Sequence, residues 1–200
     1  MNNIIPFFTY VFIVTFTPGP NNIMSMINAT NYGYKKTLKF MFGVFSGFFI
    51  LMILSSFFNL FLAKSIPKIK PYLKIIGGLY MLYLSYKILM SSKEKDDSKE
   101  IKKPLTYYSG IILQIVNVKV ILYCLTVVAT FILPNYENTL ILMSFSFLLA
   151  FIAFISLNVW AFLGNFFNKY IKKYQKVFNF VMAILLAYTA VLVSGVAEFF

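Results

Sequence analysis

The sequence has no histidine, no arginine, one cysteine and only six acidic residues among its 200. The lone Cys124 has no partner for an internal disulfide. No acidic residue falls inside a long apolar run, which excludes a pair of catalytic carboxylates there. The absence of histidine also removes the usual base of a nucleophilic enzyme and the commonest metal ligand. The sequence therefore predicts no catalytic residue, no metal site and no cofactor.

Charged residues are scarce as well. They make up 12% of the chain, whereas 60% of the residues are hydrophobic and the mean hydropathy is +0.80. A soluble domain is usually about a quarter charged, so this chain would have almost nothing polar for a water-facing surface. The net charge of +12 comes from 18 lysines, nearly all of which fall between the apolar runs or close to their ends. That distribution argues against a nucleic-acid partner, which would require a basic patch on one soluble face.

Six apolar segments account for most of the chain. They cover residues 4–27, 38–62, 71–90, 105–133, 139–163 and 177–197. Each segment is long enough to cross a hydrocarbon core of about 30 Å at about 1.5 Å per helical residue. The sequence therefore predicts an all-α membrane protein with six transmembrane helices in contact with the lipid bilayer.

The lysines are divided unequally between the loops that join these segments. Thirteen fall on one face of the membrane: Lys35, Lys36, Lys39, Lys87, Lys93, Lys95, Lys99, Lys102, Lys103, Lys169, Lys172, Lys173 and Lys176. Four fall on the other face: Lys64, Lys68, Lys70 and Lys74. Lysine-rich loops remain in the cytoplasm. We therefore expect a multi-pass protein of the inner (plasma) membrane with both termini outside.

A hydrophilic segment divides the chain into two halves. Residues 93–104 carry lysines and acidic residues whose charges nearly cancel, which is typical of a solvated linker. The expected units are a three-helix repeat at 1–92, this cytoplasmic linker, and a second three-helix repeat at 105–200. Because three spans is an odd number, the second repeat is inverted in the membrane. Inverted repeats are a common transporter architecture, with the substrate site where corresponding helices break near the midplane.

The first helix of each half contains such an interruption. In the first half it is the run Thr17-Pro18-Gly19-Pro20-Asn21-Asn22, and in the second it is Asn117-Val118-Lys119. The two prolines lack N–H donors, so carbonyls in the preceding turn lose their helical partners and could accept from a substrate ammonium. A helix that restarts after the break presents free N–H groups to a substrate carboxylate. The alternative is a kink that only shapes the bundle.

Lys119 is the only ionisable Asp, Glu, Lys, Arg or His deep inside a predicted span. An unpaired ammonium in a bilayer centre costs about 2.5–3.5 kcal/mol on insertion scales, so Lys119 should face a cavity or the bundle interior. The alternative is a lysine that extends to the membrane interface. Gln114 and Asn158 are further candidates for the cavity wall, although Asn158 could instead form a hydrogen bond between helices.

These motifs carry a resemblance to a known family. The run 17–22, followed by Asn31-Tyr32-Gly33-Tyr34-Lys35, resembles the first-helix signature of the LysE/RhtB family of amino-acid exporters. The usual second motif of that family, Asn-Pro-Lys, is here Asn117-Val118-Lys119. The valine and the sequence after it are most similar to the cysteine/O-acetylserine exporter branch. The resemblance implies export of a small neutral amino acid across the inner membrane, linked to the proton motive force.

Several alternatives stay open at this point. An intramembrane enzyme could use only a Ser–Lys pair, and a structural scaffold without transport would not need a buried lysine. Lys119 could exchange a proton during transport, or it could be a fixed counter-charge in a facilitator. The sequence also leaves open whether the chain forms a homo-oligomer.

The lysine asymmetry generates a testable topology. A reporter that is active only in the cytoplasm should be active when inserted into the 93–104 linker and inactive at either terminus, because the lysine-rich loops stay inside. Cytoplasmic activity at either terminus would contradict this orientation.

Overall fold

The computed structural model describes residues 4–57, 72, 75, 78–90 and 104–194. Every regular element in these ranges is helical, which confirms the predicted all-α class. The helices are α1 (Ile4–Phe16), α2 (Pro20–Tyr32), α3 (Tyr34–Phe57), α5 (Tyr107–Val116), α6 (Val118–Val127), α7 (Thr139–Phe166), α8 (Asn168–Lys173) and α9 (Gln175–Ser194), with a π-helix η1 (Val128–Ile132) after α6. A further helical segment covers 78–90.

The helix lengths support fewer membrane spans than the sequence predicts. Among the described residues, α3 and α7 are each long and apolar enough to cross a membrane, and the bent pair of α5 and Val118–Ile132 would make a third span. Helix α1 and the apolar part of α9, Gln175–Val191, are shorter. The count of six is therefore not confirmed. Part of the start of the predicted 71–90 span, the ends of the 38–62 and 177–197 spans and nearly all of the 93–104 linker lie outside the described residues.

The predicted first span consists of two helices. Helix α1 ends at Phe16, and α2 begins at Pro20, whose missing N–H is harmless in the first position of a helix. Helix α2 continues to Tyr32 and ends at Gly33, which has a φ of 86°. Glycine adopts this left-handed conformation without steric cost, so α3 can start in a new direction at once.

The second interruption occurs at Asn117, without a proline. Its φ of −84° and ψ of 91° are non-helical, so this residue ends α5 and precedes α6. The two helical stretches are inclined by 68°. Both predicted breaks are thus present as real interruptions of the helices.

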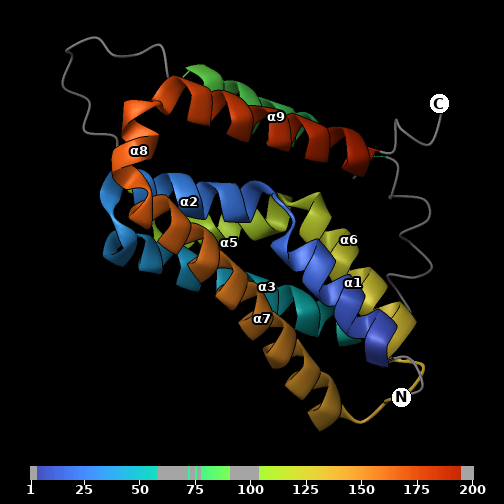
Figure 1. Cartoon of the computed structure of the whole chain (residues 1–200). Helices are drawn as coiled ribbons and strands as arrows, with labels where there is room; N and C mark the ends of the chain where they lie inside the picture. Colours follow the sequence, from blue (N-terminus) through green and yellow to red (C-terminus); the bar gives the residue numbers. More distant parts are fainter. Residues whose placement is uncertain (1–3, 58–71, 73–74, 76–77, 91–103, 195–200) are drawn as a thin grey trace.

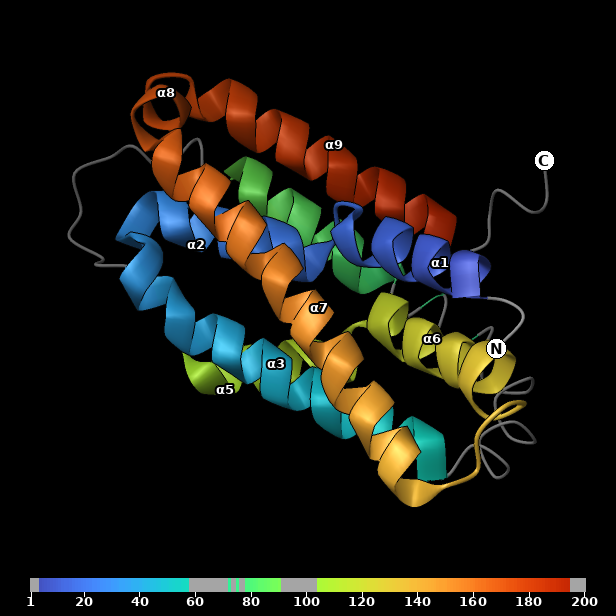
Figure 2. The ribbon, with the colours of Figure 1, turned by 60° about the horizontal axis from the view of Figure 1, so that its bottom comes forward.

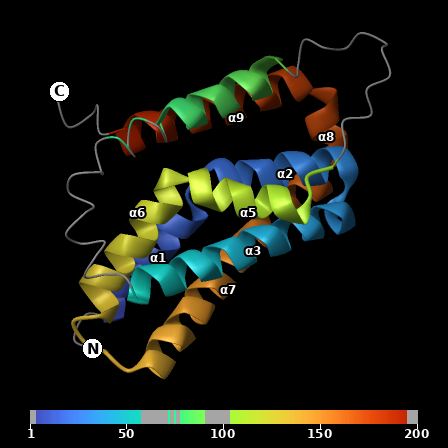
Figure 3. The same cartoon turned by 180° about the vertical axis from the view of Figure 1, so that it is seen from behind.

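The helices are arranged so that the two breaks meet near the centre of the molecule. Helix α2 packs beside α5, and α1 packs beside α6 (Figures 1 and 3). From the centre, helix α6 runs back toward the N-terminal end of α1. The α1–α2 pair and the α5–α6 pair therefore run in opposite directions. Helices α3 and α7 cross this arrangement and contact each other (Figure 2). The 78–90 segment lies against α9, where the Ser85 Oγ donates to the Ala183 carbonyl at 2.8 Å.

Two apolar clusters lie on either side of the breaks. One joins α1, α6, η1 and α7 around fully buried residues such as Phe7, Val11 and Leu149. The other joins α2, α5, α7, α9 and the 78–90 segment around Ile23 and Leu186. Helices α3 and α7 contribute to both clusters. The polar break residues therefore form a layer between two hydrocarbon-like cores.

Close packing of α3 against α5 depends on glycine. A Cβ atom on Gly43 would lie 1.9 Å from the Tyr107 carbonyl oxygen, and one on Gly110 would lie 2.4 Å from the Phe40 carbonyl oxygen. Small residues of this kind let two helix backbones approach in a membrane. This approach places Gln114 of α5 against Gly47 of α3, fully buried at the level of the breaks.

Substitution of Gly43 tests this packing. Gly43→Ala should force α3 and α5 apart and destabilise the protein by at least about 1–3 kcal/mol, the usual cost of overpacking. Ile50→Val is the matched control, because Ile50 is a half-exposed residue on the same helix. The measurement is the thermal unfolding midpoint in detergent, and equal midpoints for the two variants would contradict the proposed contact.

Candidate functional site

A chain of amide hydrogen bonds joins the two breaks. The Asn117 Nδ2 donates to the Asn21 Oδ1 at 3.2 Å, and the Asn21 Nδ2 donates to the Gln114 Oε1 at 3.2 Å. Asn117 and Gln114 are almost completely buried. The start of α2 is therefore bonded to the end of α5 and the start of α6, although these residues lie more than 90 positions apart in the sequence.

The carbonyl groups released at the end of α1 are occupied by side chains. The Asn22 Nδ2 donates to the Thr15 carbonyl at 3.0 Å and to the Thr17 carbonyl at 3.1 Å. The Lys119 Nζ also donates to the Thr17 carbonyl, at 3.1 Å. These carbonyls have no partners within their own helix, and an unsatisfied carbonyl in lipid is costly. Asn22 and Lys119 therefore act as caps for the broken helix.

Two hydroxyl groups from distant helices complete this capping. The Ser156 Oγ of α7 donates to the Thr15 carbonyl at 3.0 Å, and the Thr189 Oγ1 of α9 donates to the Pro18 carbonyl at 3.1 Å. Both side chains are buried. Donors from four helices, α2, α6, α7 and α9, thus converge on the end of α1.

Lys119 points into the protein rather than toward a membrane interface. Its Nζ would lie 3.1 Å from a Cβ atom on Gly19, so glycine at that position leaves room for the ammonium group. Within the described residues no carboxylate pairs with it, and the single described acidic residue, Glu137, lies in the loop before α7. Its charge is therefore balanced only by carbonyl dipoles in the part of the chain that the structure describes.

Two helix N-termini add to this positive charge. Helices α2 and α6 begin at the breaks, and neither the N-cap Gly19 nor the N-cap Asn117 makes a side-chain capping bond. The N-terminal end of a helix carries a partial positive charge and exposed N–H donors. With the Lys119 ammonium beside them, these ends favour an anionic ligand group.

A cavity of about 50 Å³ lies at this point. Its volume has room for a few water-sized groups. It is lined by Val14, Thr15, Gly19, Pro20, Asn21, Asn22, Val44, Phe48, Asn117, Lys119, Val120, Tyr123, Ala153 and Leu157. Six of the eight predicted binding residues are in this lining, and the other two, Thr17 and Pro18, contribute carbonyls to the same break.

Three buried polar atoms at or beside the cavity have no hydrogen-bond partner within the described residues. They are the Gln114 Nε2, the Asn117 Oδ1 and the Tyr123 hydroxyl. Buried polar groups in native proteins are nearly always bonded, so each of these atoms calls for an explanation. Asn117 and Tyr123 line the cavity directly, and Gln114 is bonded to Asn21, which lines it.

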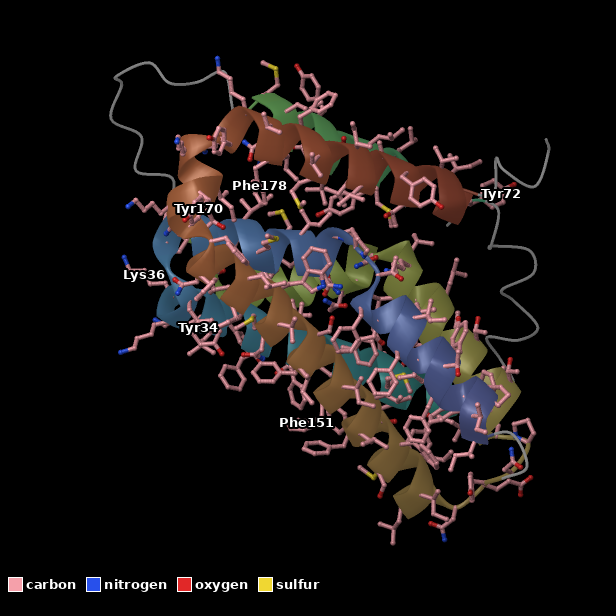
Figure 4. All side chains as sticks on the ribbon, viewed as in Figure 1. Tyr34, Lys36, Tyr72, Phe151, Tyr170 and Phe178 are labelled. Atoms are coloured by element: carbon pink, nitrogen blue, oxygen red, sulfur yellow. The ribbon has the colours of Figure 1, made fainter. Side chains whose placement is uncertain are left out.

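Asn158 lies in a different place from the other predicted residues. Its Oδ1 accepts from the Tyr34 hydroxyl of α3, and its Nδ2 donates to the Phe154 carbonyl at 2.6 Å. It lines a second hollow of about 500 Å³ on the outer side of α3 and α7, with Tyr34 and Phe151. Figure 4 shows these two residues with Lys36. In the structure Asn158 forms the helix-to-helix hydrogen bond that the sequence analysis left as its alternative.

Four cavity or capping residues escaped the sequence analysis: Thr15, Tyr123, Ser156 and Thr189. Each is a single polar residue in an apolar run. Their only signal was the general cost of a polar side chain in lipid, and that signal is shared by many serines and threonines that bond their own helix.

Residues 12–194 match the family model described as LysE type translocator. The chain belongs to this family. It is also 35% identical over 185 residues to cysteine/O-acetylserine efflux proteins of Escherichia coli K12, Shigella sonnei and Shigella flexneri, which covers 92% of this chain and 94% of theirs. No solved structure matches the chain significantly.

Membership of the LysE type translocators confirms the resemblance carried by the two motifs. The chain is a transporter and not an enzyme, so the Ser–Lys alternative is set aside. As a translocator with long apolar helices, it is a multi-pass membrane protein.

Proposed function

We propose that this LysE type translocator exports small neutral amino acids, such as cysteine or O-acetylserine, across the inner membrane. One observation carries the proposal: groups that favour an anion and groups that accept from a cation lie together at one buried cavity. A zwitterionic amino acid needs both kinds of group within a few ångströms. The efflux proteins that resemble this chain support the choice of substrate.

The carboxylate of the substrate would lie at the positive side of the cavity. The free N–H groups at the start of α2 and α6 are suited to hydrogen bonds with a carboxylate, and the Lys119 ammonium adds a full charge. Lys119 needs only to turn from the Thr17 carbonyl to reach a ligand in the same cavity.

The ammonium of the substrate would lie at the end of α1. The Thr15 and Thr17 carbonyls are released there, and they accept hydrogen bonds from Asn22 and Lys119. The unpartnered Asn117 Oδ1 is a further acceptor on the cavity wall. A substrate could therefore bind by replacing side-chain donors with its own ammonium.

The size and lining of the cavity favour a substrate with a small and uncharged side chain. Its volume is about 50 Å³ and most of its remaining lining is apolar, from Val14, Val44, Val120, Ala153 and Leu157. A lysine- or arginine-like substrate would place a second cation next to Lys119, and no carboxylate of the described residues is there to balance it.

We infer the transport architecture from the same two breaks. In this proposal the chain has six spans in two inverted three-helix repeats, 1–92 and 105–200, joined by a cytoplasmic linker at 93–104, with both termini outside. The opposite directions of the α1–α2 and α5–α6 pairs support it. Rocking of one repeat against the other would expose the cavity to each side in turn.

Asn21 provides the first test of the site. Asn21→Ala removes both side-chain hydrogen bonds that join the breaks. Labelled cysteine efflux from reconstituted liposomes should therefore fall at least tenfold while protein abundance stays near normal. Asn135→Ala is the matched control, because this exposed loop amide lies outside the cavity. A panel of competing amino acids identifies the preferred substrate. Unchanged efflux in Asn21→Ala would mean that the break is only a kink.

Lys119 provides the test of the energy source. We propose that export is linked to the proton motive force, with the Lys119 ammonium releasing a proton as the substrate leaves. Efflux from wild-type liposomes should then respond to an imposed pH gradient at fixed membrane potential, and Lys119→Gln should lose that response. If wild-type efflux ignores the gradient, the protein is a facilitator and Lys119 is a fixed counter-charge for the substrate carboxylate.

A further inference from the structure

The Tyr123 hydroxyl is a buried polar group that the proposed binding of the carboxylate and the ammonium does not use. Tyr123 is 4% exposed, lines the cavity, and its hydroxyl has no hydrogen-bond partner among the described residues. Thr15 is its polar neighbour on the same wall. A phenylalanine would fill the same volume without leaving a hydroxyl in an apolar interior, so packing alone does not account for a tyrosine here.

The ring of Tyr123 packs against two other aromatic rings. The ring of Tyr10 is stacked on it, with the centroids 5.9 Å apart and the planes inclined by 4°. The ring of Phe48, which also lines the cavity, lies 5.7 Å from it at 44°. The hydroxyl therefore has a fixed position, which is what a group that recognises a ligand requires.

The position of Tyr123 along α6 separates it from the charged part of the site. It follows Lys119 by four residues, about 6 Å along the helix, so the two side chains share one face. A substrate whose carboxylate is at Lys119 and the helix N-termini would extend its side chain along this face toward the Tyr123 hydroxyl.

The chemistry of the two unpartnered cavity atoms differs. The Asn117 Oδ1 only accepts, which suits the substrate ammonium. The Tyr123 hydroxyl both donates and accepts, which suits a thiol, a hydroxyl or the carbonyl oxygen of an ester. Other polar side chains at the break, those of Asn22, Ser156 and Thr189, donate to the backbone carbonyls at the end of α1.

We infer that Tyr123 is a specificity-determining residue, whose hydroxyl selects amino acids with a short side chain ending in a hydrogen-bonding group over equally large apolar ones. This inference rests on the proposed export of amino acids. A site that contains a buried hydroxyl rejects a ligand that leaves it unpaired. The expected discrimination is roughly tenfold to a hundredfold, the usual consequence of one unmade buried hydrogen bond.

A pair of nearly isosteric competitors tests it. Cysteine and 2-aminobutyrate differ in a thiol against a methyl group, and each is measured as an inhibitor of labelled cysteine efflux from liposomes. Wild type should prefer cysteine by at least tenfold, and Tyr123→Phe should reduce that preference to within threefold while binding 2-aminobutyrate at least as well as wild type. Tyr10→Phe is the matched control, because its ring is in the same stack but does not line the cavity; it should keep the preference.

The outcomes are separable. A full preference for cysteine in Tyr123→Phe would overturn the role of Tyr123 and leave the proposed export intact. A wild-type preference below threefold would overturn it as well, and this measurement does not depend on the folding of any variant. Wild-type liposomes that export none of the amino acids tested would instead contradict the proposed function itself.

Discussion

The broken end of α1 is the constraint on which the rest of the bundle depends. Three carbonyl acceptors at this end, those of Thr15, Thr17 and Pro18, receive donors from other parts of the fold. Since lipid offers no hydrogen bonds, such a break persists only where the protein supplies the donors. Side chains from α2, α6, α7 and α9 do so, and this requirement fixes where those four helices meet. The two apolar clusters on either side then hold the polar layer in place.

The same contacts connect stability with transport. Asn22 and Lys119 stabilise the break by donating to the carbonyls that, in the proposed function, a substrate ammonium would use. A cation at the C-terminal end of a helix is also favoured by the helix dipole, so Lys119 suits this place whether or not a ligand is present. A structural and a transport role for Lys119 are therefore compatible. In the proposed function, substrate that replaced these donors would loosen the link between α1 and the rest of the bundle, and conformational change would start from that link.

The sequence predicted the parts of the site that follow from local chemistry. The run Pro18-Gly19-Pro20 interrupts a continuous helix, and the depth of Lys119 in an apolar run favoured a place in the bundle interior. The 68° bend at Asn117 had a weaker signal in the sequence, because valine stands where the family has proline. The Asn117 side chain at this bend forms a hydrogen bond with Asn21 of α2, which only the folded chain brings close. The contacts of Ser156 and Thr189 join positions 141 and 171 residues apart, so only the folded chain brings them together. Asn158 was a weaker candidate for the cavity wall, and in the structure it lines a different hollow and accepts from the Tyr34 hydroxyl.

The charge of the site decides what kind of coupling is available to it. The amide chain of Gln114, Asn21 and Asn117 is neutral, and Lys119 is the single ionisable group of Asp, Glu, Lys, Arg or His type among the described lining residues. A zwitterionic amino acid has no net charge, so the occupied and the empty site carry the same charge as long as the ammonium stays protonated. Transport then moves no charge, and neither a pH gradient nor a potential can drive it. Coupling to protons through the described residues of this cavity therefore requires Lys119 to change its protonation state during the cycle.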